Sequence, residues 1–177
     1  MLKTSGEVWG LLKGIKFHNV FKEMMQIAVA FDQNYLNQFY ALVTSILVNN
    51  RKHKIHFHLI SSGIDSEKNN KLSGYIKSFN GAVTFYNIDH TIVNKLGQQG
   101  DWSEAVYYRL YFPLIIPSNI EKLLYLDSDT VVVNDLFDIF DMDLNGCPLG
   151  AVYDNFVKSQ PRIGIHKEGS ILILEFC

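Results

Sequence analysis

The most informative segment of this chain is Glu121-Lys-Leu-Leu-Tyr-Leu-Asp-Ser-Asp-Thr-Val-Val-Val-Asn-Asp135. In it an apolar run is followed at once by two carboxylates, Asp127 and Asp129. On a β-strand, side chains two residues apart point to the same face. A strand here would therefore bring both carboxylates to one spot at its carboxyl end, the edge where open α/β sheets bind ligands. Two carboxylates at that edge predict a site for a hard divalent cation that also holds phosphate oxygens.

Length and composition describe one globular domain without a basic surface. A chain of 177 residues is long enough for a single domain with its own core. Its net charge of −2 gives no electrostatic basis for binding nucleic acid. The two cysteines, Cys147 and Cys177, form no disulfide framework, which favours a reducing cytoplasm. No apolar stretch reaches the roughly 20 residues that a membrane span needs.

The first 24 residues differ from the rest, and we interpret them as an N-terminal extension of a domain over residues 25–177. They mix glycines and lysines with scattered apolar residues. Trp9, Leu12 and Phe17 have the spacing of a weak amphipathic helix, which suggests a peripheral contact with a membrane surface. The interpretation we favour is simpler, namely an extension that packs on the domain or lacks fixed structure.

Strand and helix patterns alternate along the rest of the chain. Short apolar runs predict the strands, and apolar residues recurring at intervals of three and four predict the helices. Asp101 and Glu104 have the spacing of a capping box at the start of the third helix, and Pro113 is expected to end it. This alternation predicts an α/β fold with a mostly parallel, doubly wound sheet flanked by helices. The expected strands cover residues 26–31, 55–60, 82–88, 123–126 and 149–153, and the expected helices cover residues 34–50, 65–79, 101–112 and 136–140.

Four short segments are informative because of the order in which they occur. They are Val29-Ala-Phe-Asp-Gln-Asn-Tyr35, Phe57-His-Leu-Ile-Ser-Ser-Gly-Ile64, Tyr107-Tyr-Arg-Leu110 and Leu124-Tyr-Leu-Asp-Ser-Asp-Thr-Val-Val132. In this order they resemble glycosyltransferase family 8, the retaining nucleotide-sugar transferases that include bacterial lipopolysaccharide galactosyl- and glucosyltransferases. The resemblance spans roughly residues 26–169. It implies a Rossmann-like nucleotide-diphospho-sugar transferase fold of the GT-A type.

The resemblance also implies a role for each of five residues. Asp127 and Asp129 would hold Mn²⁺ or Mg²⁺ on the diphosphate of a UDP-sugar donor, with Asp127 also contacting the ribose. Asp32 would accept a hydrogen bond from the uracil edge, and Asn34 would bond the ribose or base region. Tyr35 would stack on the base, as aromatic rings do with planar heterocycles. The plain structural alternatives are that Asp is common at strand ends and that Asn34 caps a helix.

Arg109 and Asp154 complete the set of candidate catalytic residues. An arginine among so many aromatic residues is costly without a partner. The resemblance places Arg109 on the hydroxyls of the donor sugar and near Asp127, and the structural alternative is simply an ion pair with a nearby carboxylate. Asp154 matches a position near the donor and acceptor sugars.

Three histidines could be mistaken for a metal cluster, namely His53, His56 and His58. We predict that they are structural. On a strand His56 and His58 share one face, while their apolar neighbours share the other. Family members carry a similar Phe-His step in this strand without a catalytic role.

The function that the resemblance implies is a retaining hexosyltransferase. It would move galactose or glucose from UDP-galactose or UDP-glucose to a saccharide or lipid-linked saccharide acceptor. The setting would be lipopolysaccharide or cell-surface glycan synthesis, in the cytoplasm or at the inner membrane surface. After residues 150–154 the family's Asn-Ala-Gly or Asn-Ser-Gly strand is missing, which predicts an incomplete acceptor half.

Two alternatives from other classes stay open. The first is a truncated, non-catalytic remnant that binds a UDP-sugar and a metal. The second is a haloacid-dehalogenase-type phosphatase, because Leu126-Asp-Ser-Asp-Thr-Val131 also fits its Asp-x-Asp-x-Val pattern. That scheme requires the motif near the start of the chain, whereas here about a hundred residues of αβ pattern precede it, so it ranks last.

Overall fold

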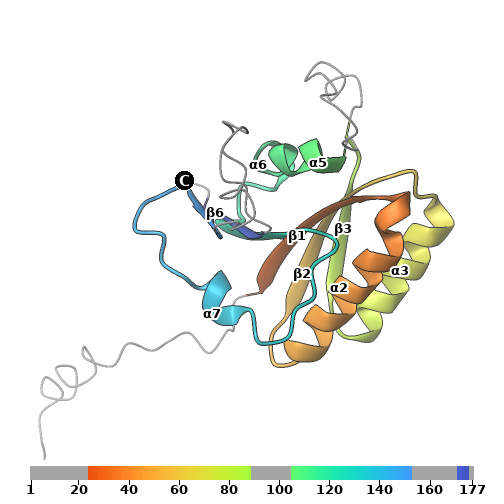
Figure 1. Ribbon diagram of the computed structural model, residues 1–177, viewed down its shortest axis with the longest axis horizontal. Helices are drawn as coiled ribbons and strands as arrows, with labels where there is room; N and C mark the ends of the chain where they lie inside the picture. The colour runs from red at the N-terminus through yellow and green to blue at the C-terminus, as the bar shows by residue number, and fades with distance from the viewer. Residues whose placement is uncertain (1–23, 89–104, 153–170, 176–177) are drawn as a thin grey trace, which may run out of the picture.

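The computed structural model describes residues 24–88, 105–152 and 171–175, which form a six-stranded sheet with helices on both faces (Figure 1). Within these ranges, no helix is long and apolar enough to cross a bilayer. The elements are β1 (Met25–Asp32), η1 (Gln33–Tyr35), α2 (Leu36–Asn49), β2 (Ile55–Ser62), α3 (Ser66–Ser78), β3 (Ala82–Tyr86), α5 (Ala105–Tyr108), η3 (Arg109–Tyr111), α6 (Phe112–Ile115), β4 (Lys122–Leu126), α7 (Phe137–Phe140), β5 (Leu149–Ala151) and β6 (Ile171–Glu175).

The strands lie in the order β3-β2-β1-β4-β6-β5. Strands β1 to β4 are parallel to one another, whereas β6 runs antiparallel to β4 and β5. The predicted α/β fold with a mostly parallel sheet is therefore confirmed. From β1 the chain winds outward through β2 to β3, and then returns to place β4 on the other side of β1. This reversal between β1 and β4 is the topological switch point, where sheets of this kind bind ligands.

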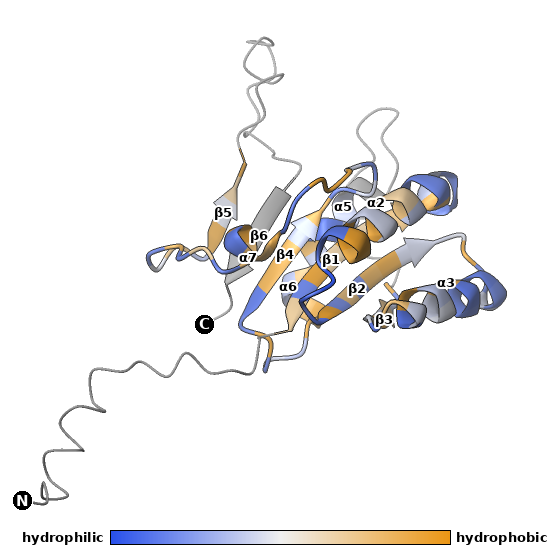
Figure 2. Cartoon of the chain, turned by 90° about the horizontal axis from the view of Figure 1, so that it is seen from below, coloured by the Kyte–Doolittle hydropathy of each residue, from blue (hydrophilic) through white to orange (hydrophobic). Residues whose placement is uncertain are grey.

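Alternation along β1 gives each face of the sheet its own core. Ile27, Val29 and Phe31 pack under α2 and α3, and the Phe31 ring stacks on Phe39 of α2 with centroids 4.2 Å apart. The opposite face carries the small Ala28 and Ala30, and there α5, η3 and α6 lie close against the sheet. Figure 1 shows the two helical layers on opposite sides of the strands. In Figure 2 the central strands are coloured largely hydrophobic and α3 largely hydrophilic, as expected of a buried sheet under an amphipathic helix.

Two local predictions were wrong. Asn34 does not cap the helix predicted over residues 34–50, because the Asp32 carboxylate instead accepts a hydrogen bond from the Asn34 N–H (2.8 Å) and opens a 3-10 turn ahead of α2. Pro113 does not end a helix. It lies in the first turn of α6, where a backbone N–H has no acceptor within the helix, so proline is tolerated there.

Most other element boundaries agree with the predictions to within two residues. Helix α3 begins after Asp65, whose carboxylate caps it by accepting from the Lys68 N–H (2.8 Å). The C-terminal segment, apolar enough for a strand, does form β6 and pairs with β4. Residues 1–23, Asp101, Glu104 and Tyr153 lie outside the described residues.

The histidines of β2 have protein partners on neighbouring strands. His58 is buried, and its two ring nitrogens lie 2.8 Å from the Tyr86 hydroxyl of β3 and 2.8 Å from the Gln26 side-chain oxygen of β1. His56 bonds Thr84 of β3 at 2.8 Å. Burial, and to a lesser extent the neighbouring His56, lowers the pKa of His58 to about 4. These rings therefore tie three strands together, as expected of structural histidines.

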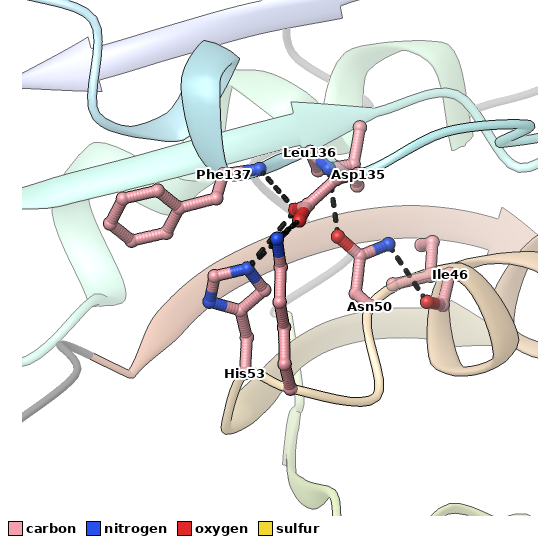
Figure 3. A network of polar contacts seen from close by, with 7 residues as sticks. Ile46, Asn50, His53, Asp135, Leu136 and Phe137 are labelled. Carbon is pink, nitrogen blue, oxygen red and sulfur yellow. Dashed lines mark hydrogen bonds and ion pairs between the residues drawn. The ribbon is translucent and has the colours of Figure 1, made fainter.

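A second polar cluster joins the loop after α2 to the segment after β4 (Figure 3). Asp135 lies 2.6 Å from the Lys52 ammonium and 3.1 Å from the His53 ring nitrogen, and it accepts from the Phe137 N–H at 2.9 Å. Beside it, the buried Asn50 accepts from the Leu136 N–H at 2.7 Å. The cluster fixes the course of the chain between β4 and α7.

Candidate functional site

The candidate site lies at the carboxyl edge of the sheet, on both sides of the switch point. Asp32 ends β1, and Asp127 directly follows β4. Because β1 and β4 are adjacent and parallel, with Ala28 opposite Tyr125, these two carboxylates belong to the same edge. The fold therefore brings together two segments that lie almost a hundred residues apart in the sequence.

A tight turn, rather than a continued strand, presents the two carboxylates of the Asp-Ser-Asp motif. Strand β4 ends at Leu126, and the Thr130 N–H donates to the Asp127 carbonyl at 3.1 Å, which closes a turn. Ser128 is buried, whereas Asp127 is partly exposed and Asp129 is exposed. The alternation argument from the sequence was therefore wrong in its geometry, although Ser128 does point inward while the carboxylates stay accessible.

Arg109 reaches this edge from η3 and forms an ion pair with Asp127. Its guanidinium nitrogen Nη2 lies 3.1 Å from Asp127 Oδ1, with 15% of the arginine side chain and 24% of the aspartate side chain exposed. The guanidinium carbon also lies 5.1 Å from the centroid of the Tyr125 ring. The proximity of Arg109 to Asp127 that the resemblance implied is thus present, and it partly neutralises the acidic pair.

Tyr125 lies beneath this ion pair and was not among the residues singled out from the sequence. Only 2% of it is exposed. Burial, more than any other effect, raises the pKa of its hydroxyl far above the usual range; the charge of Arg109 lowers that pKa, while the charges of Asp127 and Asp129 raise it further. Both carboxylates therefore act on one hydroxyl group. In the sequence nothing distinguished it from the other residues of this apolar run.

The loop after β1 supplies the other candidate contacts. Asn34 and Tyr35 lie in η1 with exposed side chains, and 42% of Tyr35 is accessible. The loop after β2 packs against this turn: Gly63 has φ +70, and a Cβ there would lie 3.4 Å from Gln33 Cβ. Gly63 thus lets the chain turn sharply after β2 without displacing Gln33 in the loop after β1.

The acidic pair fits a hard cation in chemistry, though the described residues supply only part of a coordination shell. Carboxylate oxygens suit Mn²⁺ or Mg²⁺, and ions of this kind keep open positions for substrate phosphates. Among residues 24–88, 105–152 and 171–175, no group of three or more histidine, cysteine, aspartate or glutamate side chains comes together as a metal site. Asp154 lies outside these ranges.

Comparison with known proteins decides the family. The sequence profile described as Glycosyl transferase family 8 matches residues 26–170, which is most of the chain. The chain belongs to glycosyltransferase family 8. The expectation drawn from its four motifs is therefore confirmed.

Individual relatives agree with this assignment. The chain is 29% identical over 132 residues to the lipopolysaccharide 1,2-glucosyltransferase of Escherichia coli K12, and 23% identical over 130 residues to the lipopolysaccharide 1,3-galactosyltransferase of Salmonella typhimurium. These matches cover 75% and 73% of this chain but 39% of each relative. The crystal structure of the galactosyltransferase LgtC, in complex with donor and acceptor sugar analogs, has a TM-score of 0.74 at 25% identity, covering 85% of this chain and 58% of LgtC. The fold is thus that of GT-A type glycosyltransferases, and the chain spans about two fifths of the curated relatives.

Proposed function

We propose that this chain binds a UDP-hexose at the β1/β4 edge and contributes to the retaining transfer of the hexose to a saccharide acceptor. The observation that carries the proposal is the position of Asp127 and Asp129 at the switch point, with Arg109 3.1 Å from Asp127. Similarity to both a glucosyltransferase and a galactosyltransferase supports glucose or galactose as the hexose. Of the two alternatives, neither the phosphatase nor the non-catalytic remnant gains support from the comparisons.

Each candidate residue has a task in this scheme. Asp32 and Asn34 are proposed to hold the uracil and ribose, with the exposed Tyr35 ring stacked on the base. Asp127 and Asp129 are proposed to hold Mn²⁺ or Mg²⁺, and Asp154 to lie near the two sugars. When bound, the cation would stabilise the charge that develops on the leaving diphosphate. Binding energy from the base and ribose then helps orient the anomeric carbon.

Arg109 is proposed to contact the hydroxyl groups of the donor sugar. One of its terminal nitrogens is engaged by Asp127, while the planar guanidinium carries further N–H donors in fixed directions. Because the side chain is held between Asp127 and the Tyr125 ring, these donors have one preferred orientation. The arginine can therefore position a sugar as well as balance the acidic pair.

The lipopolysaccharide relatives also suggest where the reaction takes place. We propose a lipid-linked saccharide as the acceptor, used in the cytoplasm at the inner membrane surface, in the synthesis of lipopolysaccharide or another surface glycan. This setting fits a nucleotide-sugar donor, because such donors are charged and remain in water.

Calorimetric titration with UDP, in the presence and absence of Mn²⁺, tests the proposed site. The expected result is metal-dependent binding that weakens at least roughly 100-fold in Asp127→Ala and in Asp129→Ala, because each change removes a charged ligand. Asp141→Ala, which removes an exposed aspartate elsewhere, is the matched control and should bind as the unaltered chain does. Unchanged binding in both site variants would rule the site out. Hydrolysis of UDP-glucose and UDP-galactose, measured in parallel, identifies the hexose and separates a transferase from a remnant that only binds.

A further inference from the structure

We propose that Ser45 and Asn49 of α2 are positioning residues for the acidic pair, because together they fix the chain just after Asp129. The inference rests on the proposed function, since it concerns the same cation site. It assigns a role to two polar side chains that no motif in the sequence singles out.

The segment that follows the Asp-Ser-Asp turn belongs to no helix or strand over residues 130–136, so no ladder of backbone hydrogen bonds fixes its course. It runs along α2 before it reaches α7 (Figure 1). The Val132 side chain is 6% exposed and belongs to the same core cluster as the buried face of α2, whereas Val131 and Val133 are 62% and 74% exposed. Val132 is therefore the first residue after the turn that packs into the core.

Both backbone polar groups of Val132 are bound by side chains of α2. The Val132 N–H donates to the Ser45 hydroxyl oxygen at 3.0 Å, and the Val132 carbonyl accepts from the Asn49 side-chain amide at 2.9 Å. Ser45 and Asn49 are four residues apart, so they lie on one face of the helix, about one turn from each other. We call this pair of hydrogen bonds the Val132 clamp.

The helix itself orients the two side chains of the clamp. The Ser45 hydroxyl donates its proton to the Leu42 carbonyl at 2.7 Å, which leaves the oxygen to accept from Val132. The Asn49 amide also donates to the Ser45 carbonyl at 2.9 Å. A hydroxyl carries one proton and a side-chain amide carries two, so every donor of the pair is used. Side chains held in this way can position other groups.

The position of Asp129 depends on the clamp more than that of Asp127 does. Asp127 directly follows β4 and pairs with Arg109 at 3.1 Å, so the strand and the arginine fix it. Asp129 is exposed and lies between the turn hydrogen bond, from the Thr130 N–H to the Asp127 carbonyl at 3.1 Å, and the Val132 clamp. Loss of the clamp is therefore expected to weaken a cation held by both carboxylates, while the contacts to base and ribose stay intact.

The double variant Ser45→Ala/Asn49→Ala removes the clamp and keeps the helix, since alanine is the strongest helix former. Thr44→Val is the matched control. It also removes a partly buried hydroxyl of α2, but one that bonds the Tyr40 carbonyl at 2.5 Å and the Tyr75 hydroxyl at 2.7 Å instead of the segment after β4. Ser45→Thr keeps the hydroxyl and is the conservative variant.

Three quantities are measured for each variant. They are the Mn²⁺ affinity at saturating UDP, from the EPR signal of free Mn²⁺, the UDP affinity without metal, by calorimetry, and the thermal unfolding midpoint. The single variants Ser45→Ala and Asn49→Ala are measured as well. Each keeps one of the two hydrogen bonds, so they decide the question if the double variant does not fold.

The expected result is a roughly tenfold loss of Mn²⁺ affinity in the double variant and a smaller loss in each single variant, with metal-free UDP affinity unchanged. Thr44→Val and Ser45→Thr should bind Mn²⁺ as the unaltered chain does.

Equal Mn²⁺ affinity in the clamp variants and the unaltered chain overturns the positioning role and leaves the proposed function standing. An equal loss in Thr44→Val also overturns it, because any disturbance of α2 would then account for the effect. A parallel loss of metal-free UDP affinity overturns it too, since the clamp would then support the whole domain and not the acidic pair. Absence of Mn²⁺-dependent UDP binding in the unaltered chain overturns the proposed function and this inference together.

Discussion

Asp127 and Asp135 are only eight residues apart, yet the fold uses them in different ways. Asp135 is enclosed by donors of the protein itself, namely Lys52, His53 and the Phe137 N–H. Asp127 forms an ion pair with Arg109 and lies two residues before a second carboxylate, Asp129, which is exposed. One aspartate thus completes a local network, whereas the other belongs to an acidic pair at the edge of the sheet.

This difference separates a structural tie from a candidate ligand site. Around Asp135, donors from the loop after α2 and from the start of α7 satisfy the carboxylate and hold the two segments together. At the other cluster, Arg109 pairs with Asp127, and the exposed Asp129 follows two residues later. Two close carboxylates repel each other, and a divalent cation would relieve that repulsion. Substitutions at the two clusters should therefore affect different observables, binding and turnover in one case and stability in the other.

The largest expected effect is on turnover, from Arg109→Lys. Lysine keeps a positive charge beside Asp127 but lacks the planar fork that is proposed to hold the donor sugar. We expect hydrolysis of the UDP-hexose to fall roughly 100-fold, comparable to removing one fixed donor from an active site. Mn²⁺-dependent UDP binding should change little, because the acidic pair and the charge balance are preserved. Arg51→Lys, at an exposed position, should leave both quantities unaltered. Hydrolysis at the level of the unaltered chain would exclude the proposed sugar contact.

A smaller effect, on stability alone, is expected from Asp135→Ala. The change removes the acceptor for the Phe137 N–H and for the His53 ring, whose side chain is only 3% exposed. We expect the free energy of unfolding, measured by urea denaturation, to fall by about 2 kcal/mol. Affinity for UDP with Mn²⁺ should stay the same. Asp138→Ala, an exposed aspartate three residues away, serves as the control. Loss of UDP binding in Asp135→Ala would show that the two clusters are not independent.

The stabilisation by Asp135 should also depend on pH. Burial alone raises its pKa, but hydrogen bonds from Lys52, the Phe137 N–H and His53 outweigh it and lower the pKa well below the usual value of 3.8. The unfolded chain therefore takes up a proton at this residue before the folded chain does. Stability is then fully present above that unfolded value, and declines as the pH falls through it toward the folded pKa. In urea titrations from pH 6 to pH 3, the difference between the unaltered chain and Asp135→Asn should shrink as the pH falls. A constant difference over this range would argue against the assigned cause.

The sequence predicted the sheet well because its signals are local. The apolar runs that became β1 and β4 are continuous, as strands buried on both faces must be, and in β2 only His56 and His58 interrupt the run from Ile55 to Ile60. A helix over residues 65–79 was predicted from its periodicity, and the structure has it over residues 66–78 with Asp65 as its cap. The errors arose where two local signals compete. Asp32 and Asn34 both favour the cap position, and the choice depended on where β1 ended.

The candidate site was predicted in part, and through resemblance more than through pattern. The Asp-Ser-Asp motif, read as a strand with alternating side chains, suggested a shared spot, but β4 ends before it and a turn presents both carboxylates. The contact of Tyr125 with Arg109 joins β4 to η3 across the sheet face, and no local pattern reports a contact of that kind. In the sequence Tyr125 is indistinguishable from any other residue of a buried apolar run.

The smallest expected effect comes from Lys52→Met, which tests how much of the Asp135 cluster depends on its surface charge. Lys52 lies 2.6 Å from Asp135, but 65% of its side chain is exposed, so water and salt screen the pair. Asp135 also keeps His53 and the Phe137 N–H as partners when the lysine is removed. We expect the thermal unfolding midpoint to change by about 1 °C or less, and this small change to vanish in high salt. A shift as large as that of Asp135→Ala would mean that the ion pair, and not the buried hydrogen bonds, holds the cluster together.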